Sequence, residues 1–90
     1  MRSLPRKLRK NGFPYSQVLR GRRCCIYEQH VAPRINYFEV FVIKVKPAQE
    51  IFGRFYPEGE VFPGNEDFGI RAWSFRSWEK ALEKYNEMEQ

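Results

Sequence analysis

The sequence contains few cysteine and histidine residues, and this limits the chemistry available to the protein. There are two cysteines, Cys24 and Cys25, and one histidine, His30. Neighbours in a strand point to opposite faces, so the two thiols cannot serve one site, and Cys24 and His30 stand about 20 Å apart if the run is one strand. Three such residues are one ligand short of a closed zinc site and do not make a disulfide framework. We therefore expect reduced, structural cysteines and no catalytic triad.

Long apolar runs are also absent. No stretch approaches the roughly 20 residues needed to cross a bilayer, and the first residues, MRSLPRK, lead into more charge instead of the apolar core of a signal peptide. A chain of 90 residues with 42% hydrophobic and 17% aromatic content builds one small core. The sequence predicts a soluble, cytoplasmic protein with no membrane span.

Acidic residues are missing from the first quarter of the chain. Residues 1–23 hold eight lysine and arginine residues and no aspartate or glutamate, whereas the rest of the chain has eight basic and eleven acidic residues. Basic clusters bind a phosphate backbone by releasing counterions. The sequence assigns any nucleic-acid contact to Arg6, Lys7, Arg9, Lys10, Arg20, Arg22 and Arg23. An anionic membrane surface and solubility alone are the alternative explanations of this charge.

The segment 1–12 is predicted to be a flexible basic tail. It has few apolar side chains, an internal Pro5 and a terminal Asn11-Gly12 breaker, so it has little to bury against a core. A single domain is expected over residues 13–90. Deletion of the tail is then expected to leave stability nearly unchanged.

Three strands are predicted between residues 15 and 46. The runs 15–20 and 23–31 are short and β-rich, and Gly21 between them favours a hairpin. The run 36–46 is dense in β-branched and aromatic residues at both odd and even positions. This pattern indicates a central strand that is buried on both faces.

The second half of the chain is expected to form a long aromatic loop, a strand and a helix. Residues 47–71 are rich in turn formers, and the loop is expected to pack onto the sheet through Phe52, Phe55, Tyr56, Phe62 and Phe68. A strand is predicted over 72–76, and Ser77 is placed to cap a helix over 78–89. The buried face of that helix is predicted to hold Trp78, Ala81, Leu82, Tyr85 and Met88. The predicted fold is α+β, an antiparallel sheet of about four strands with one C-terminal helix packed on a face.

Several stretches resemble short uncharacterised proteins of phage and bacterial genomes. They are YFEVFVIKVK, IFG, YPEGEVFPGNEDFG and AWSFRSWEKALEKY, and the likeness covers residues 15–88. The resemblance implies a bacterial or mobile-element origin and supplies no catalytic residues.

The tripeptide Asp67-Phe68-Gly69 matches the magnesium-binding letters of protein kinases. The glycine-rich loop, the strand lysine and the catalytic loop that phosphoryl transfer also needs are missing, so we interpret the tripeptide as a turn. The acidic residues of this region do not have the spacing of a calcium loop: Glu58, Glu60, Glu66 and Asp67. We interpret them as a solvated loop and expect no metal and no cofactor.

The function predicted from the sequence is that of a small non-enzymatic binding or accessory module. The sequence has a coherent fold pattern and a separate basic segment, but its residues do not form a recognisable catalytic group. The partner is expected to be a nucleic acid, through the basic N-terminal segment, or a protein. Two alternatives stay open. One is a phage-type protein that binds and modulates a host protein through the aromatic loop, and the other is an enzyme built on the four carboxylates.

Overall fold

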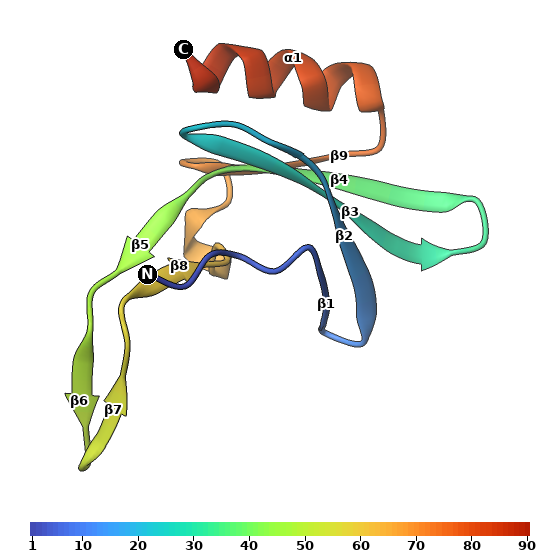
Figure 1. Ribbon diagram of the computed structural model, residues 1–90. Helices are drawn as coiled ribbons and strands as arrows, with labels where there is room; N and C mark the ends of the chain where they lie inside the picture. The colour runs from blue at the N-terminus through green and yellow to red at the C-terminus, as the bar shows by residue number, and fades with distance from the viewer.

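A five-stranded antiparallel sheet carries one C-terminal helix on one of its faces (Figure 1). The computed structural model describes all 90 residues. The sheet has the order β1-β2-β3-β4-β9, with strands β1 (Lys7–Lys10), β2 (Phe13–Arg20), β3 (Cys24–Ala32), β4 (Ile35–Val42) and β9 (Ala72–Phe75). Two further sheets have two strands each, made by β5 (Lys44–Lys46) with β8 (Gly59–Val61) and by β6 (Gln49–Ile51) with β7 (Arg54–Tyr56). The predicted fold class is confirmed, and the hairpin predicted through Gly21 is the β2–β3 pair.

The centre of the fold is the start of β3, where four consecutive residues have no exposed surface: Cys24, Cys25, Ile26 and Tyr27. Because neighbours in a strand point to opposite faces, Cys24 and Ile26 lie in the cluster beneath the helix, whereas Cys25 and Tyr27 belong to the cluster on the other face. Strand β4, next to β3, also contributes to both clusters. The central strand predicted from residue 36 onward corresponds to β4, and its two buried faces are confirmed. The two thiols of β3 point to opposite sides of the sheet as expected.

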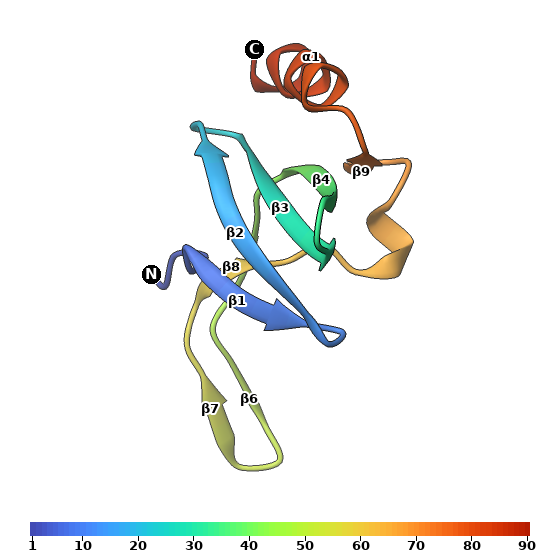
Figure 2. The same cartoon turned by 90° about the vertical axis from the view of Figure 1, so that its right-hand side faces the viewer.

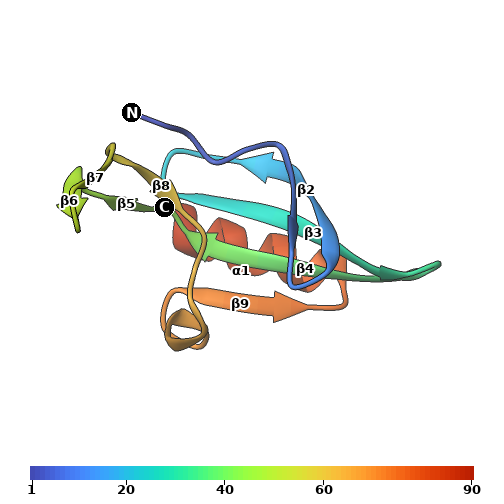
Figure 3. The same cartoon turned by 90° about the horizontal axis from the view of Figure 1, so that it is seen from below.

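Helix α1 (Trp78–Glu89) contacts β3, β4 and β9 (Figure 3). The hydroxyl of Ser77 accepts a hydrogen bond from the backbone amide of Lys80 at 3.3 Å, which is the predicted N-cap. Ala81 and Tyr85 are buried against the sheet. Trp78, expected on the buried face, is the first helical residue and is 40% exposed; its ring packs edge-on against Phe38 with a centroid distance of 5.4 Å. With 12 residues and a charged outer face, α1 is too short and too polar to cross a bilayer.

Irregular segments, and no second helix, cover the opposite face of the sheet. The ring of Phe62, which follows β8, lies with its centroid 4.6–6.0 Å from those of Tyr15, Tyr27 and Phe41. Leu4 from the N-terminus and Phe68 from the last loop pack against the same cluster. Aromatic pairs of this kind contribute about 0.5–1.5 kcal/mol beyond the area that they bury. They hold the chain after β8 firmly on this face.

The N-terminal segment is part of the fold. Lys7–Lys10 pair with β2 as strand β1, and Leu4 is buried. Arg2 donates its backbone amide to the carbonyl of Glu58 and accepts from the amide of Glu60, at 3.2 and 2.8 Å. The flexible tail predicted from composition is therefore not what the structure shows. The strand pairs through its backbone, so the charge of its side chains does not prevent it from joining the sheet edge.

The segment between β4 and β9 also differs from its prediction. The predicted strand 36–46 divides at Ile43, whose amide donates to the carbonyl of Arg23 at 2.7 Å, and the chain continues as β5 outside the main sheet. The predicted loop 47–71 contains β6, β7, β8 and a short 3-10 helix, η1 (Asn65–Asp67). Of its aromatic residues, two pack onto the sheet as expected, Phe62 and Phe68. The other three are exposed: Phe52, Phe55 and Tyr56.

Deletion of residues 1–12 should destabilise the protein. The deletion removes β1 and the buried Leu4 side chain, and loss of a buried leucine side chain alone costs about 2–5 kcal/mol. We expect a lower urea midpoint for the deletion, and a smaller decrease for Leu4→Ala. Unchanged midpoints for both variants would show that the segment is not packed.

Candidate functional site

Four exposed apolar side chains lie on the β6–β7 hairpin, which we call the arm (residues 49–56): Ile51, Phe52, Phe55 and Tyr56. The strand register places Ile51 and Tyr56 on one face of the arm and Phe55 on the other. Figures 1 and 2 show the arm extending from β5 and β8, away from the main sheet and from the helix. Its two strands pair with each other and with no other strand. Both outer edges of the arm therefore present unpaired backbone groups.

The apolar side chains of the arm do not pack into either core cluster. Ile51 and Tyr56 are each 42% exposed, Phe55 is 60% exposed, and Phe52 at the tip is fully exposed. Burial of apolar surface stabilises a protein by about 25 cal/mol per Å², and these side chains forgo that stabilisation in the free protein. Several large apolar side chains left exposed on one projecting element indicate an interaction site.

The turn at the tip of the arm has a backbone conformation that disfavours its first residue. Phe52 has φ +51° and Gly53 has φ +77°, the positive values that a type I′ turn requires. A bulky residue in this region costs about 1–2 kcal/mol, and asparagine is preferred there. The β1–β2 turn has nearly the same angles, with Asn11 at +53° and Gly12 at +83°. The protein thus has the preferred Asn-Gly pair at one hairpin and an exposed phenylalanine at the equivalent position of the other.

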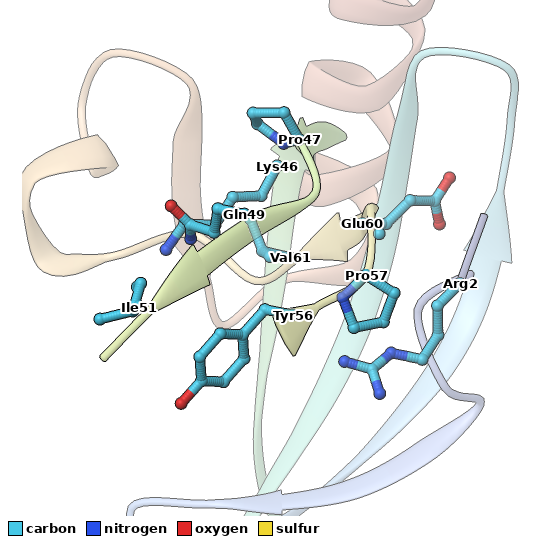
Figure 4. Close-up of a pocket in the computed structure, with 10 residues that line it drawn as sticks. Arg2, Lys46, Pro47, Gln49, Ile51, Tyr56, Pro57, Glu60 and Val61 are labelled. Atoms are coloured by element: carbon cyan, nitrogen blue, oxygen red, sulfur yellow. The ribbon is translucent and has the colours of Figure 1, made fainter. Parts of the chain in front are cut away.

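A hollow of about 220 Å³ lies where the arm joins the rest of the protein (Figure 4). Ile51 and Tyr56 of the arm line it together with Pro47, Pro57 and Val61. Small-molecule and cofactor sites usually measure about 300–1,000 Å³, so this hollow is too small for most such ligands. Its volume suits one or two amino-acid side chains.

Glu60, which also lines the hollow, is engaged within the protein. Its carboxylate accepts two hydrogen bonds from the guanidinium of Arg20, both at 2.6 Å, and one from the amide of Leu4 at 2.9 Å. The bidentate pair with Arg20 is the main cause that lowers the pKa of Glu60, against a smaller opposing effect of burial. Glu60 therefore ties β8 to the end of β2 and to the N-terminal segment, and these contacts fix the β8 side of the hollow.

The basic residues predicted to contact nucleic acid fall into two groups. Arg6, Lys7, Arg9 and Lys10 lie in or just before β1, whereas Arg20, Arg22 and Arg23 lie at the β2–β3 turn. Four of the seven donate side-chain hydrogen bonds within the protein: Arg9, Lys10, Arg20 and Arg23. Contact of these seven residues with nucleic acid stays a prediction.

The β2–β3 turn presents three backbone amides to one carboxylate. The amides of Arg22, Arg23 and Cys24 donate to Glu89 at 2.8–3.3 Å. Partial burial acts to raise the pKa of Glu89, but the three hydrogen bonds outweigh it and lower the pKa. Gly21 permits this close approach, because a Cβ at that position would lie 2.5 Å from the Glu89 carboxylate. Converging amides of this kind bind anions, and here the anion is the carboxylate of Glu89, the last residue of α1.

The thiols and the imidazole lie apart. Cys24 and Cys25 are fully buried, and burial raises the pKa of Cys25 to about 12. At the other end of β3, His30 Nε2 lies 3.4 Å from the hydroxyl of Ser16 and 3.7 Å from a carboxylate oxygen of Glu28. Both contacts fall on the same nitrogen, whereas a serine triad needs the acid on the other one. These groups do not form an activated nucleophile.

The Asp67-Phe68-Gly69 stretch forms the predicted turn. The Asp67 carboxylate accepts from the amide of Gly64 at 2.9 Å and from Arg71 Nε at 3.0 Å, and these two hydrogen bonds lower the pKa of Asp67. Gly69 follows with φ +91°. The carboxylate therefore holds the backbone of the turn together.

The four acidic residues of this region do not converge on one point. Glu60 and Asp67 are held by Arg20 and Arg71, respectively, and the other two, Glu58 and Glu66, are exposed. No group of three His, Cys, Asp or Glu side chains is placed to hold a metal ion. The geometry therefore offers no common site for these carboxylates.

One buried carboxyl group, Glu39 of β4, is incompletely hydrogen-bonded. It is 6% exposed, one oxygen accepts from the hydroxyl of Tyr15 at 3.0 Å, and the other oxygen has no partner. Burial raises the pKa of Glu39, and the hydrogen bond from Tyr15 opposes this shift. The hollow at the base of the arm does not include Glu39, so we assign it a structural role.

No protein-family model, curated protein or solved structure matches the chain. The likeness to phage and bacterial proteins stays a prediction.

Sequence reasoning identified the aromatic segment but missed that it forms a separate hairpin. The signal was present in IFGRFY, where Gly53 lies between two short β-rich pairs, a pattern typical of a tight hairpin turn. An aromatic-rich segment is compatible both with packing on the sheet and with exposure at a binding site, so composition does not distinguish the two. The sequence pattern did not identify the hollow, because only long-range pairing brings Arg2 and Lys46 to either side of Gly59.

Substitution of Phe52 by asparagine should make the arm more ordered. Asn-Gly is the preferred pair for this turn, and relief of about 1 kcal/mol of backbone strain corresponds to amide exchange in the arm that is roughly fivefold slower. Amide hydrogen exchange by NMR measures this effect. The reciprocal variant, Asn11→Phe, should speed exchange in β1 and β2. Faster exchange in the arm of Phe52→Asn would contradict the strain argument.

Substitution of Glu39 by glutamine should change how stability depends on pH. A carboxyl group whose pKa is raised on folding contributes stability that is present below its unfolded pKa, about 4.3, and is lost as pH rises through the folded value. Glu39→Gln should therefore be more stable than the wild type at pH 7, and the difference should shrink toward pH 4. Urea unfolding at several pH values tests this, with Glu66→Gln as the exposed control. A difference that grows toward acidic pH would contradict the assignment.

Proposed function

We propose that the protein is a non-enzymatic binding module that presents its arm to a protein partner. The observation that carries this proposal is Phe52, an aromatic side chain in full contact with solvent and held at positive φ. Residues with a strained backbone conformation cluster at functional sites. Exposed aromatic residues that become buried on binding are typical anchors of protein interfaces.

The charge around the arm favours a protein over a nucleic acid. The segment 44–61 has three basic and three acidic side chains: Lys44, Lys46, Arg54, Glu50, Glu58 and Glu60. Binding to a phosphate backbone depends on an excess of positive charge. The centre of a protein interface is rich in aromatic residues and poor in net charge. The free strand edges of the arm also allow an extended segment of a partner to pair with it.

This proposal combines two hypotheses drawn from the sequence. From the first it takes the class of protein, a non-enzymatic binding module. From the second, a protein that modulates a host protein, it takes the aromatic segment as the contact surface. A nucleic-acid contact through β1 and the β2–β3 turn, a bacterial or mobile-element origin and a cytoplasmic location remain predictions. The arm does not depend on any of them.

A display selection with two matched variants tests the proposal. The immobilised chain selects binders from a library of displayed bacterial genomic fragments, and the binders are then compared on Phe52→Asn and on Ile70→Asn. Both changes replace an exposed apolar side chain by asparagine, and Ile70 lies outside the arm. We expect Phe52→Asn to weaken binding by at least tenfold, the size of a moderate interface anchor, and Ile70→Asn to leave it unchanged. Binders that tolerate Phe52→Asn would contradict the proposal.

A further inference from the structure

Two cations beside the hollow have no partner within the protein. Arg2 and Lys46 both line the hollow and are exposed, and neither side chain takes part in an ion pair. The carboxylate that lines the same hollow, Glu60, is satisfied by Arg20 and by the amide of Leu4. Figure 4 shows this carboxylate pointing away from Ile51 and Tyr56. The hollow is therefore left with positive charge that no group of the chain neutralises.

The pairing of strands places these two cations on either side of one glycine. Lys46 is the cross-strand partner of Gly59 in β8, and Arg2 bridges Gly59 from the other side. Neighbouring strands lie about 4.8 Å apart, so the Cα atoms of Arg2 and Lys46 are separated by roughly 10 Å. Gly59 is buried, and a Cβ there would lie 3.2 Å from the Cβ of Arg2. The absence of a side chain at Gly59 thus allows Arg2 to pack closely against β8, on the side opposite Lys46.

The other side of the hollow is apolar. Ile51 and Tyr56 face it from the arm, and Pro47 and Val61 come from the segments beside it. A ligand that fills the hollow therefore meets an apolar wall and a pair of cations within a space of about 220 Å³. An extended segment with a carboxylate side chain next to an apolar side chain complements both the two cations and the apolar wall.

We infer that the hollow receives an acidic-apolar segment of the partner, with an aspartate or glutamate between Arg2 and Lys46 and a neighbouring apolar side chain against Ile51 and Tyr56. The inference rests on the proposed function and specifies the chemistry of the partner. Charge complementarity favours an acidic segment, because the unpaired charges at the hollow, those of Arg2 and Lys46, are positive. The arm beside the hollow carries no net charge. The arm's free edge offers the segment backbone hydrogen bonds in the same extended conformation.

A library of random linear peptides displayed on phage tests this inference. Peptides selected on the wild-type chain should be enriched in aspartate or glutamate next to an apolar residue. Arg2→Glu and Lys46→Glu should each weaken the selected peptides by about tenfold, whereas Lys80→Glu, the same charge change on the exposed face of α1, should not. A new selection on the double variant Arg2→Glu/Lys46→Glu should yield peptides rich in lysine and arginine, a result that a misfolded variant cannot give.

Four results would overturn the inference. The first is a selection that returns no peptides, and the second is a set of peptides that depend on Phe52 but show no acidic preference; the second leaves the proposed function intact. The third is binding of a single-stranded oligonucleotide that is lost with Lys46→Glu, which would assign the cations to phosphate. The fourth is a dimer, seen by sedimentation and abolished by Lys46→Glu, which would make the occupant a second copy of the chain.

Discussion

The structure depends on burial of β3 on both of its faces. Four consecutive residues, Cys24–Tyr27, have no exposed surface, and a strand can satisfy such a run only if each face of the sheet is covered. A chain of 90 residues has one long helix to use as a cover. The second face therefore has to be covered by segments without regular structure, and this requirement organises the rest of the molecule.

The coverage of the second face explains three features that look unrelated in the sequence. The basic N-terminal segment is held against the sheet because Leu4 fills part of this face. Phe62 and Phe68 fill the remainder, and Glu60 fastens β8 to Arg20 and to the N-terminal backbone. The arm lies between these anchored segments and has no face left to cover. Its aromatic side chains are thus exposed on a firmly held base, an arrangement suited to binding.

The arm combines local weakness with a defined shape. An isolated two-stranded hairpin is marginally stable in water, and Phe52 adds strain at its tip. A partner that buries Phe52 and Phe55 supplies the apolar contact that the hairpin lacks, so binding and ordering of the arm are expected to be coupled. The side of the hollow formed by β8 belongs instead to the anchored part, because Glu60 pairs with Arg20. The surface therefore joins an adaptable hairpin to a base that is held to the main sheet.

The sequence by itself determined the elements whose signals are local. Ser77 and the apolar spacing after it define the helix, the mixed apolar parity around Phe41 defines a strand buried on both faces, and Asp67 with Gly69 defines a turn. Tertiary structure decided the features that depend on long-range partners: whether an aromatic residue packs on the sheet or is exposed, whether the basic segment pairs with a strand edge, and whether Arg2 and Lys46 line the same hollow. Phe52 and Phe62 are the same residue type in the same segment, so composition cannot show that the first is exposed and the second packs on the sheet. The difference arises because Phe62 lies over the open face of the sheet and Phe52 lies beyond its end, a fact fixed only when distant segments pair.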